Sequence, residues 1–205
     1  MLPSTERVNG QKPAVSKESL LRQKLFKKGK PFIRRFEHEK DLWLLWASYD
    51  LGGFDWIERG LDKDKFVFQV MAYMSVFHNL WLIEDDNPYF KGRRGPVCIV
   101  GIQTNGWSIE PHFEFFKWAS KRSILRCMVM FFQKARHDKQ VGVVVGRTFK
   151  KYVDNLTHLK KYGVLFYCGK IPNGFPQGDE YVFYVKGARA LMNEEEIQRC
   201  LQLPR

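Results

Sequence analysis

Apolar and polar residues alternate along this chain with two periods, one typical of helices and one typical of strands. Between residues 123 and 137, Ile124, Cys127, Met128, Phe131 and Phe132 lie three or four positions apart, which predicts a helix with one apolar face. Similar spacing predicts helices at residues 39–50, 62–77 and 149–162. Short runs rich in β-branched and aromatic residues predict strands at residues 32–36, 80–83, 96–104, 108–118, 141–145, 164–168 and 181–185.

The order of these elements is β-α-α-β-β-β-α-β-α-β-β, which indicates one α/β domain of the mixed-sheet (α+β) kind. Asn105-Gly106 stands between two predicted strands and is a strong signal for a tight hairpin turn. The short apolar run at residues 141–145 is typical of a buried central strand. We therefore expect a sheet that contains hairpins, and not a strictly alternating doubly wound fold.

The two ends of the chain differ in composition from its middle. Residues 1–30 are polar and basic, so we treat them as an extended N-terminal arm that does not fold alone. Residues 31–187 form the predicted domain, and residues 188–205 form a C-terminal tail with a short helix capped at residues 193–196. Within the arm, four apolar residues with helix-like spacing predict a short amphipathic helix on the surface of a partner protein: Leu20, Leu21, Leu25 and Phe26.

The arm also carries most of the net charge. The whole chain has a formal net charge of +12. Residues 1–35 hold ten lysines and arginines against two glutamates, a balance of +8, which leaves +4 for the other 170 residues. This distribution predicts non-specific electrostatic contact of the arm with DNA or acidic neighbours, while sequence-specific reading of DNA is not supported.

Other site classes find little support in the sequence. The four cysteines, Cys98, Cys127, Cys168 and Cys200, form no C-x-x-C pair and have no histidine at zinc-ligand spacing, so no metal site is predicted. Cys98, Cys127 and Cys168 lie in apolar runs and are expected to be buried thiols. No apolar run approaches the length of a membrane span, and no secretion signal is recognised at the N-terminus.

One stretch gives the chain a recognisable resemblance. The segment EPHFEFFKWASKRSI at residues 110–124, the strand-loop-helix around it and the later helix that ends in Lys161-Tyr162-Gly163 resemble the GNAT (acetyltransferase-like) superfamily over residues 31–187. The segment is similar to divergent GNAT-like proteins of bacteriophages, some of them acetyltransferases and others internal-virion or morphogenesis proteins. The resemblance implies a GNAT fold, a location in the virion or host cytoplasm, and acetyl-CoA in a wedge between residues 108–118 and 141–145.

The resemblance also assigns cofactor contacts to the loop and the helix that follows it. In the family this loop reads approximately Arg/Gln-x-x-Gly-x-Gly/Ala, and its glycines let the backbone approach the phosphates. The matching positions here are Ser120, Ser123 and Leu125, so both glycines are missing. The basic side chains can compensate, or they form only a solvated rim. The implied contact residues are Phe116, Trp118, Lys121, Arg122, Ser123 and Arg126.

Three side chains of the predicted strand 108–118 are candidates for the catalytic base. Glu110, His112 and Glu114 share one face because side chains alternate along a strand, and Glu110 lies nearest to the family's usual position. The alternative is a strand with a polar outer face. The family's proton-donating tyrosine lies four residues before the glycine that ends the later helix, and Leu159 occupies that position.

Two functions remain open at this point. One is a degenerate acetyltransferase that serves as a structural or assembly component of a phage particle, binds no cofactor, and docks its basic arm on virion proteins or DNA. The other is an active acetyl-CoA-dependent N-acetyltransferase that acts on an amine. Trp56 and Trp107 lie in or next to glycine-rich turns, and exposed aromatic residues there would form a protein interface.

Overall fold

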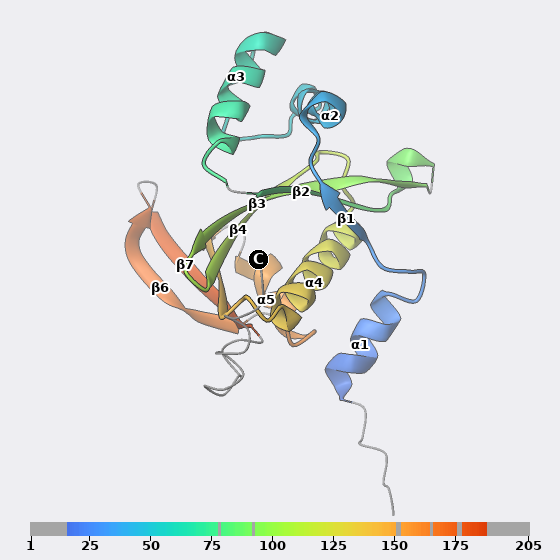
Figure 1. Cartoon of the computed structure of the whole chain (residues 1–205), viewed down its shortest axis with the longest axis vertical. Helices are drawn as coiled ribbons and strands as arrows, with labels where there is room; N and C mark the ends of the chain where they lie inside the picture. The colour runs from blue at the N-terminus through green and yellow to red at the C-terminus, as the bar shows by residue number, and fades with distance from the viewer. Residues whose placement is uncertain are drawn as a thin grey trace, which may run out of the picture.

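Seven strands form one mixed sheet in the order β1-β2-β3-β4-β5-β7-β6 (Figure 1). This architecture comes from a computed structural model that describes residues 16–77, 79–91, 93–150, 153–164, 166–175 and 178–187. The strands are β1 (Phe32–Arg35), β2 (Asn79–Asp86), β3 (Arg94–Asn105), β4 (Ser108–Phe115), β5 (Val143–Phe149), β6 (Phe166–Phe175) and β7 (Gly178–Lys186).

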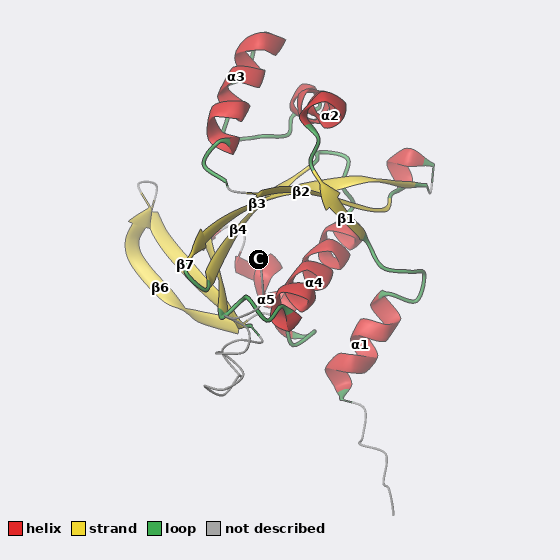
Figure 2. Ribbon diagram, in the orientation of Figure 1, coloured by secondary structure: helices red, strands yellow, loops and turns green. Residues whose placement is uncertain are grey.

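Helices cover both faces of the sheet (Figure 2). On one face lie α2 (His38–Asp50) and α3 (Lys63–Met74), and on the other α4 (Lys121–His137) and α5 (Val153–Lys160). Each layer has its own apolar cluster, in which Leu45 and Phe66 are fully buried on the first face and Cys127 and Val129 on the second. No helix in the described part of the chain has the length and apolar character needed to cross a membrane.

Most of the predicted elements are confirmed, and several of their boundaries were wrong. The helix predicted at 149–162 begins at Val153, because Phe149 is still a strand residue whose backbone pairs with Glu180. Strands β6 and β7 extend well beyond the predicted runs, because their antiparallel pairing continues through polar positions such as Lys170 and Glu180. The predicted caps at residues 193–196, together with Cys200, lie outside the described residues. Cys98 and Cys127 are buried, as predicted.

The short helix predicted within the N-terminal arm is confirmed, but it packs on the chain's own domain. Residues 17–25 form helix α1 (Lys17–Leu25), which begins with the Ser16 side chain accepting the Ser19 N–H, and this helix packs on its own domain. Leu25 and Phe26 contact the cluster around α4, whereas Leu20 remains exposed. Part of the apolar side of α1 is therefore buried against its own domain, because α4 lies nearby (Figure 1).

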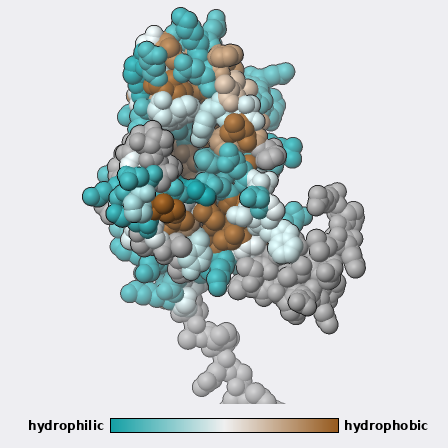
Figure 3. Space-filling model, turned by 90° about the vertical axis from the view of Figure 1, so that its left-hand side faces the viewer, coloured by the Kyte–Doolittle hydropathy of each residue, from teal (hydrophilic) through white to brown (hydrophobic). Residues whose placement is uncertain are grey.

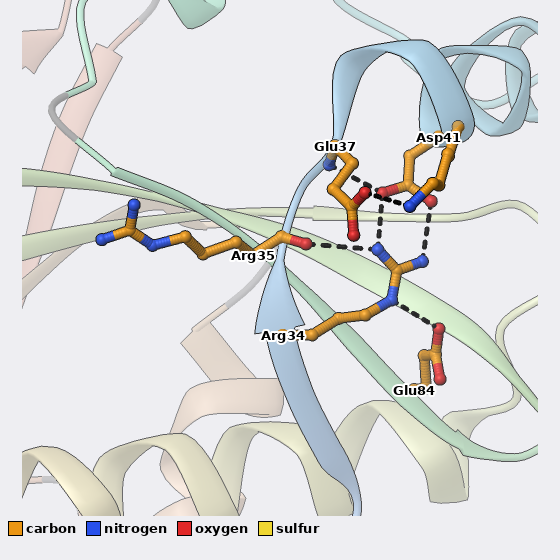
Figure 4. A network of polar contacts seen from close by, with 6 residues as sticks. Arg34, Arg35, Glu37, Asp41 and Glu84 are labelled. Atoms are coloured by element: carbon orange, nitrogen blue, oxygen red, sulfur yellow. Dashed lines mark hydrogen bonds and ion pairs between the residues drawn. The ribbon is translucent and has the colours of Figure 1, made fainter.

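A partly buried ion-pair network fastens the first strand to the first helix layer (Figure 4). The Arg34 guanidinium on β1 donates to both carboxylate oxygens of Asp41 on α2, at 2.6 and 2.7 Å, and to Glu84 on β2 at 3.1 Å. Asp41 also accepts the backbone N–H of Glu37, where α2 begins. Burial acts to raise the pKa of Asp41, but these hydrogen bonds outweigh it and hold that pKa below its usual value.

We expect Asp41→Asn to lower the free energy of unfolding by about 2–4 kcal/mol, because Arg34 would lose its buried counter-charge. The folded pKa of Asp41 lies below its unfolded value near 3.8, so wild type should lose this advantage as the pH falls below about 4. Urea unfolding at pH 7 and pH 3 measures both effects. Lys40→Ala, which removes the exposed Lys40–Glu37 pair, is the control and should cost less than about 1 kcal/mol. An equal loss in the free energy of unfolding for Asp41→Asn and Lys40→Ala would contradict the prediction.

Candidate functional site

The sheet opens between β4 and β5. The two strands pair in parallel only at Ser108 with Val143 and at Ile109 with Val144. Beyond these residues β4 continues along β3 to Phe115, while β5 pairs with β7 on its other side. The β5-facing edge of β4 therefore has no strand partner in the described residues beyond Ile109. The wedge predicted from the sequence is confirmed, with α4 following the loop after β4 (Figure 1).

Glu110, His112 and Glu114 share the face of β4 that is turned toward α2 and α3. The intervening residues Ile109 and Phe113 pack against the cluster under α4, as the alternation of a strand requires. The prediction of a shared polar face is confirmed. Glu110, His112 and Glu114 are all half-buried, which also agrees with the alternative of a polar outer face, and side chains of the α2–α3 layer partly cover Glu114.

A pocket with aromatic walls lies between this face of β4 and helix α3. Figure 3 shows the molecule from the side of β6 and β7, with a recess below the layer of α2 and α3. The ring of Phe77 lies 4.9 Å from the imidazole of His112, and a Cβ atom at Gly101 would overlap that ring. The pocket-lining residues with aromatic or titratable side chains are Phe54, Trp56, Tyr73, Phe77, His112, Phe113 and Glu114.

The loop before α3 completes the pocket at the cost of backbone strain. Phe54 has a φ of 56°, in the left-handed region that side chains other than glycine rarely adopt, and its ring is buried. This conformation places Trp56 over the pocket, where its ring lies 4.6 Å from that of Tyr73. The Trp56 Nε1 donates a hydrogen bond of 2.9 Å to Glu114 Oε2.

Glu114 is the carboxylate whose pKa this environment shifts most. Burial raises the pKa of Glu114 to about 7, although hydrogen bonds from Trp56 and from the Phe54 backbone act against this rise. The nearby Asp55 raises it further by repulsion. A carboxyl group with a pKa close to neutral pH can release and accept a proton under physiological conditions, which is the property of a general base.

Glu110 belongs to a second cluster, which spans the opening of the sheet. Arg147 on β5 lies 3.3 Å from Glu110 on β4 and 3.1 Å from Glu180 on β7. The Nε2 of His112 lies 3.8 Å from Glu110. Burial lowers the pKa of His112, and of its charged neighbours Glu110 raises it while Arg147 lowers it. Glu110, the residue nearest to the family's usual base, is thus held in an ion pair, and His112 favours its neutral form.

The start of α4 is the expected position for a phosphate group. Ser120 caps the helix by accepting the N–H of Ser123, and the Ser123 hydroxyl donates to the Asp86 carbonyl. Lys121 and Arg122 are exposed at this end. Leu125, which replaces a family glycine, packs its side chain against the core cluster. The residues fit a nucleotide thioester: the N–H groups and two cations of the first turn suit phosphates, and the open edge of β4 suits an amide chain.

Several solved structures resemble this arrangement of strands and helices. No protein-family model and no curated protein matches the chain. A probable acetyltransferase of the GNAT family from Chromobacterium violaceum superposes with a TM-score of 0.59 and 12% identity, covering 94% of this chain and 98% of its own. The chain has the GNAT fold. Spermidine N-acetyltransferase from Vibrio cholerae, solved with CoA and spermine, gives a TM-score of 0.54 and 12% identity over 80% of this chain and 99% of its own.

Within the GNAT fold, two predicted cofactor contacts belong to the core packing: Phe116 is buried and Trp118 is partly buried. Phe116 belongs to the cluster under α2 and α3, and Trp118 stacks on it at 5.0 Å between ring centres. The Trp118 Nε1 donates to the Pro96 carbonyl at 2.8 Å. Both side chains therefore support the loop between β4 and α4.

The prediction that Arg126 contacts the cofactor is wrong. Its side chain is buried and pairs with Asp85 on β2 at 2.6 and 2.9 Å. Its terminal nitrogens also donate to the carbonyl oxygens of Leu25 and Gly29, at 2.6 and 2.8 Å. A guanidinium with these four bonds is not directed at a phosphate, so Arg126 fastens the N-terminal arm to the domain and does not meet the expected cofactor.

The position of the GNAT tyrosine is occupied by a core residue. Leu159 is fully buried in the cluster under α4. Tyr162 is partly buried, and its carbonyl accepts a hydrogen bond from Arg22 of α1. Tyr152 lies outside the described residues. Among the described residues, Tyr73 is the tyrosine that lines the pocket, and burial raises its pKa, as does the charge of Glu114.

The two tryptophans predicted to be exposed are exposed, with 46% of Trp56 and 48% of Trp107 accessible to solvent. Trp56 also belongs to the pocket, which its sequence context did not indicate. Sequence reasoning further missed Tyr73 and Phe77 of the pocket wall and Arg147 of the ion-pair cluster. Each contacts β4 from a distant segment, so no local pattern of residues could have identified it.

Proposed function

We propose that this chain is an acetyl-CoA-dependent N-acetyltransferase whose acceptor is a cationic amine. The observation that supports it most is the position of Glu114, a partly buried carboxyl with a pKa near 7, at an aromatic pocket beside the open edge of β4. An ammonium group gains from a carboxylate and from the faces of aromatic rings. The pocket offers both, in a chain that is strongly basic elsewhere.

In this proposal, different residues bind the amine, accept its proton and hold the cofactor. Trp56 and Tyr73 bind the ammonium group against their rings, and the Trp56 N–H orients the Glu114 carboxylate. Glu114 accepts a proton from the ammonium, which leaves an amine with a free electron pair. Lys121, Arg122 and the first turn of α4 would hold the phosphates of acetyl-CoA, and the open edge of β4 its amide chain. Acetyl-CoA would supply the acetyl group as an activated thioester: the amine nitrogen forms the new C–N bond while the C–S bond breaks, and CoA leaves as a thiol with the second proton that the amine gives up.

The structural match from Vibrio cholerae supports an amine as acceptor, since that enzyme is named for spermidine and was solved with spermine and CoA. In the present chain Glu110, Glu114 and Glu180 lie near the open part of the sheet, and Arg147 pairs with Glu110 and Glu180 but not with Glu114. This excess of negative charge favours a cationic acceptor over a neutral one.

Calorimetric titration with acetyl-CoA tests the proposal directly. We expect binding, and a melting temperature that rises with ligand concentration, because at 100 times the dissociation constant a ligand adds about 2.7 kcal/mol to the stability. Arg122→Glu should weaken this binding by reversing one charge at the exposed start of α4, while Lys134→Glu at the other end of the helix should not. A titration that shows neither heat of binding nor a thermal shift would contradict the proposal.

A second candidate function is a non-catalytic structural role in a bacteriophage particle. Ser123 and Leu125 at the family's glycine positions, and Leu159 at its tyrosine, favour it. In that role Trp56, Trp107 and the arm with Leu20 and Leu21 would contact other virion proteins, and the basic side chains of the arm at residues 1–30 would contact packaged DNA. Mass spectrometry of purified particles is its test, and absence of the chain from them would exclude this role.

A further inference from the structure

We propose that the end of the molecule built by the turn between β2 and β3, the start of α4 and the linker after α1 binds single-stranded nucleic acid. This site is separate from the aromatic pocket and goes beyond the proposed function, although it shares Lys121 and Arg122 with the proposed cofactor site. It is defined by a column of aromatic rings that reaches the surface at Tyr89, and by the basic residues around that column.

The column starts in the core and ends in solvent. Phe116 is buried, Trp118 stacks on it with ring centres 5.0 Å apart, and Tyr89 stacks on Trp118 at 5.5 Å with an angle of 20° between the rings. Phe90 supports the column from the side, with its ring centre 6.0 Å from that of Trp118. Tyr89 is 60% exposed, so its ring offers an open surface at the end of a rigid stack.

The backbone of the turn fixes the position of Tyr89. The short helix η1 (Pro88–Phe90) begins after Asn87, whose buried side-chain oxygen accepts the Tyr89 N–H at 3.1 Å. The Asn87 N–H in turn bonds the carbonyl of Arg93 at 3.2 Å, which closes the turn. An exposed ring held in this way loses little conformational freedom when a planar ligand stacks on it.

Three segments bring cations to the same end of the molecule. The Ser123 hydroxyl bonds the Asp86 carbonyl, which joins the start of α4 to the turn. Arg94 donates to the Lys30 carbonyl at 3.4 Å, which joins the linker after α1 to the same turn. In Figure 1 the turn with η1, the upper end of α4 and the linker between α1 and β1 all lie toward the right-hand end of the sheet. The exposed cations of these segments are Lys27, Lys28, Lys30, Lys91, Arg93, Arg94, Lys117, Lys121 and Arg122.

The carboxylates of this region leave most of that charge unbalanced. Asp85 is buried and paired with Arg126, and Glu84 is paired with Arg34. Asp86 is the exposed carboxylate of the turn. Within the described part of the chain, Lys91, Arg93, Lys117, Lys121 and Arg122 form no ion pair with a carboxylate.

Stacking and charge together indicate the class of ligand. Cations neutralise phosphates, and an open aromatic ring stacks on a base that has no partner strand. The bases of a duplex already stack on one another, so duplex DNA would use the charges but not Tyr89. An anionic membrane would likewise use only the charges. The stacked column therefore favours a single strand over either of these partners.

Fluorescence anisotropy with labelled (dT)12 and (rU)12 tests the proposal on the full-length protein. We expect binding that weakens as salt rises, and Tyr89→Ala should weaken it by about 5- to 100-fold while Tyr89→Phe keeps it within about threefold. Removing two phosphate contacts with Lys91→Gln and Arg93→Gln should lower the slope of log affinity against log salt by about 1.4. Lys134→Gln and Lys139→Gln, at the other end of α4, remove the same charge and should change the slope much less. The relative affinity of the two oligonucleotides decides between DNA and RNA.

Several outcomes would overturn this site. Wild-type affinity in Tyr89→Ala would show that no base stacks on Tyr89. Equal losses of affinity in Tyr89→Ala and Tyr89→Phe would show the same. Equal binding of duplex DNA or of phosphatidylglycerol vesicles, with no effect of Tyr89→Ala, would reduce the surface to a general cation patch. Complete displacement of (dT)12 by acetyl-CoA, with Tyr89→Ala weakening both ligands alike, would assign these residues to the cofactor instead. Melting curves of each variant confirm folding, which the exposure of Tyr89 favours.

Discussion

Glu114→Gln is expected to lower kcat/KM for an amine acceptor by about 10²- to 10⁴-fold, the range by which a positioned general base accelerates a reaction. Glutamine keeps the size of the side chain and a carbonyl oxygen for the Trp56 N–H, but it cannot accept the proton of the ammonium. The wild-type rate should rise with pH through about 7, the pKa of Glu114, and this rise should disappear in the variant. The measurement is a pH profile of acetyl transfer to a set of primary amines.

The stability of the same variant provides an independent check. The folded pKa of Glu114, about 7, lies above the 4.5 of an exposed glutamate, so the folded protein holds this proton more tightly than the unfolded chain does. Wild type should therefore lose stability as the pH rises from about 4.5 to about 7, and Glu114→Gln should escape this loss. Glu39→Gln on the exposed side of α2 is the control and should change neither property. An unaltered pH profile in Glu114→Gln would contradict its role as the base.

Arg126→Met is expected to lower the free energy of unfolding by about 3–5 kcal/mol, because it leaves the Asp85 carboxylate buried without a counter-charge. The same change removes the hydrogen bonds to the carbonyl oxygens of Leu25 and Gly29, so helix α1 should detach more readily. Thermal unfolding measures the first effect, as a fall in Tm on the order of 10 °C. Limited proteolysis with trypsin measures the second, as faster cleavage at Lys24 and Lys27.

The double variant Arg126→Met with Asp85→Leu serves as the control for that experiment. It removes both charges, so it should regain much of the lost stability, while the bonds to α1 remain absent and proteolysis stays fast. Arg122→Gln, one turn earlier and exposed, should leave both readouts near wild type. A single Arg126→Met variant that melts and resists trypsin like wild type would show that the arm is held by other contacts.

The elements that could be predicted from the sequence are those with a strong local pattern. Helix α4 carries its apolar residues at regular spacing, and Asn105-Gly106 marks the turn between β3 and β4, where Gly106 has a φ of 59°. The start of α5 could not be predicted, because Phe149 is kept in β5 by its pairing with β7, a contact that no local pattern encodes. Tertiary pairing outweighs helical spacing there.

In the candidate site, too, local patterns could be predicted from the sequence and tertiary contacts could not. The shared face of Glu110, His112 and Glu114 follows from the alternation of one strand and could be predicted. The order of importance among the three could not, because burial under Trp56 and Tyr73 distinguishes Glu114, and these side chains come from elements far away in the sequence. Arg126 shows the converse: its position near the phosphate loop suggested a cofactor contact, but its partner Asp85 lies 41 residues away.

The absence of a side chain at Gly101 on β3 affects the chemistry of the neighbouring strand β4. The Phe77 ring occupies the space that a Cβ atom at Gly101 would need, and it covers the imidazole of His112, which pairs with Gly101 across the two strands. Any larger residue at position 101 would displace the ring and admit water to the imidazole. The pKa of His112, which burial now lowers, would then rise toward its ordinary value, so the missing methyl group on β3 helps to keep that pKa low.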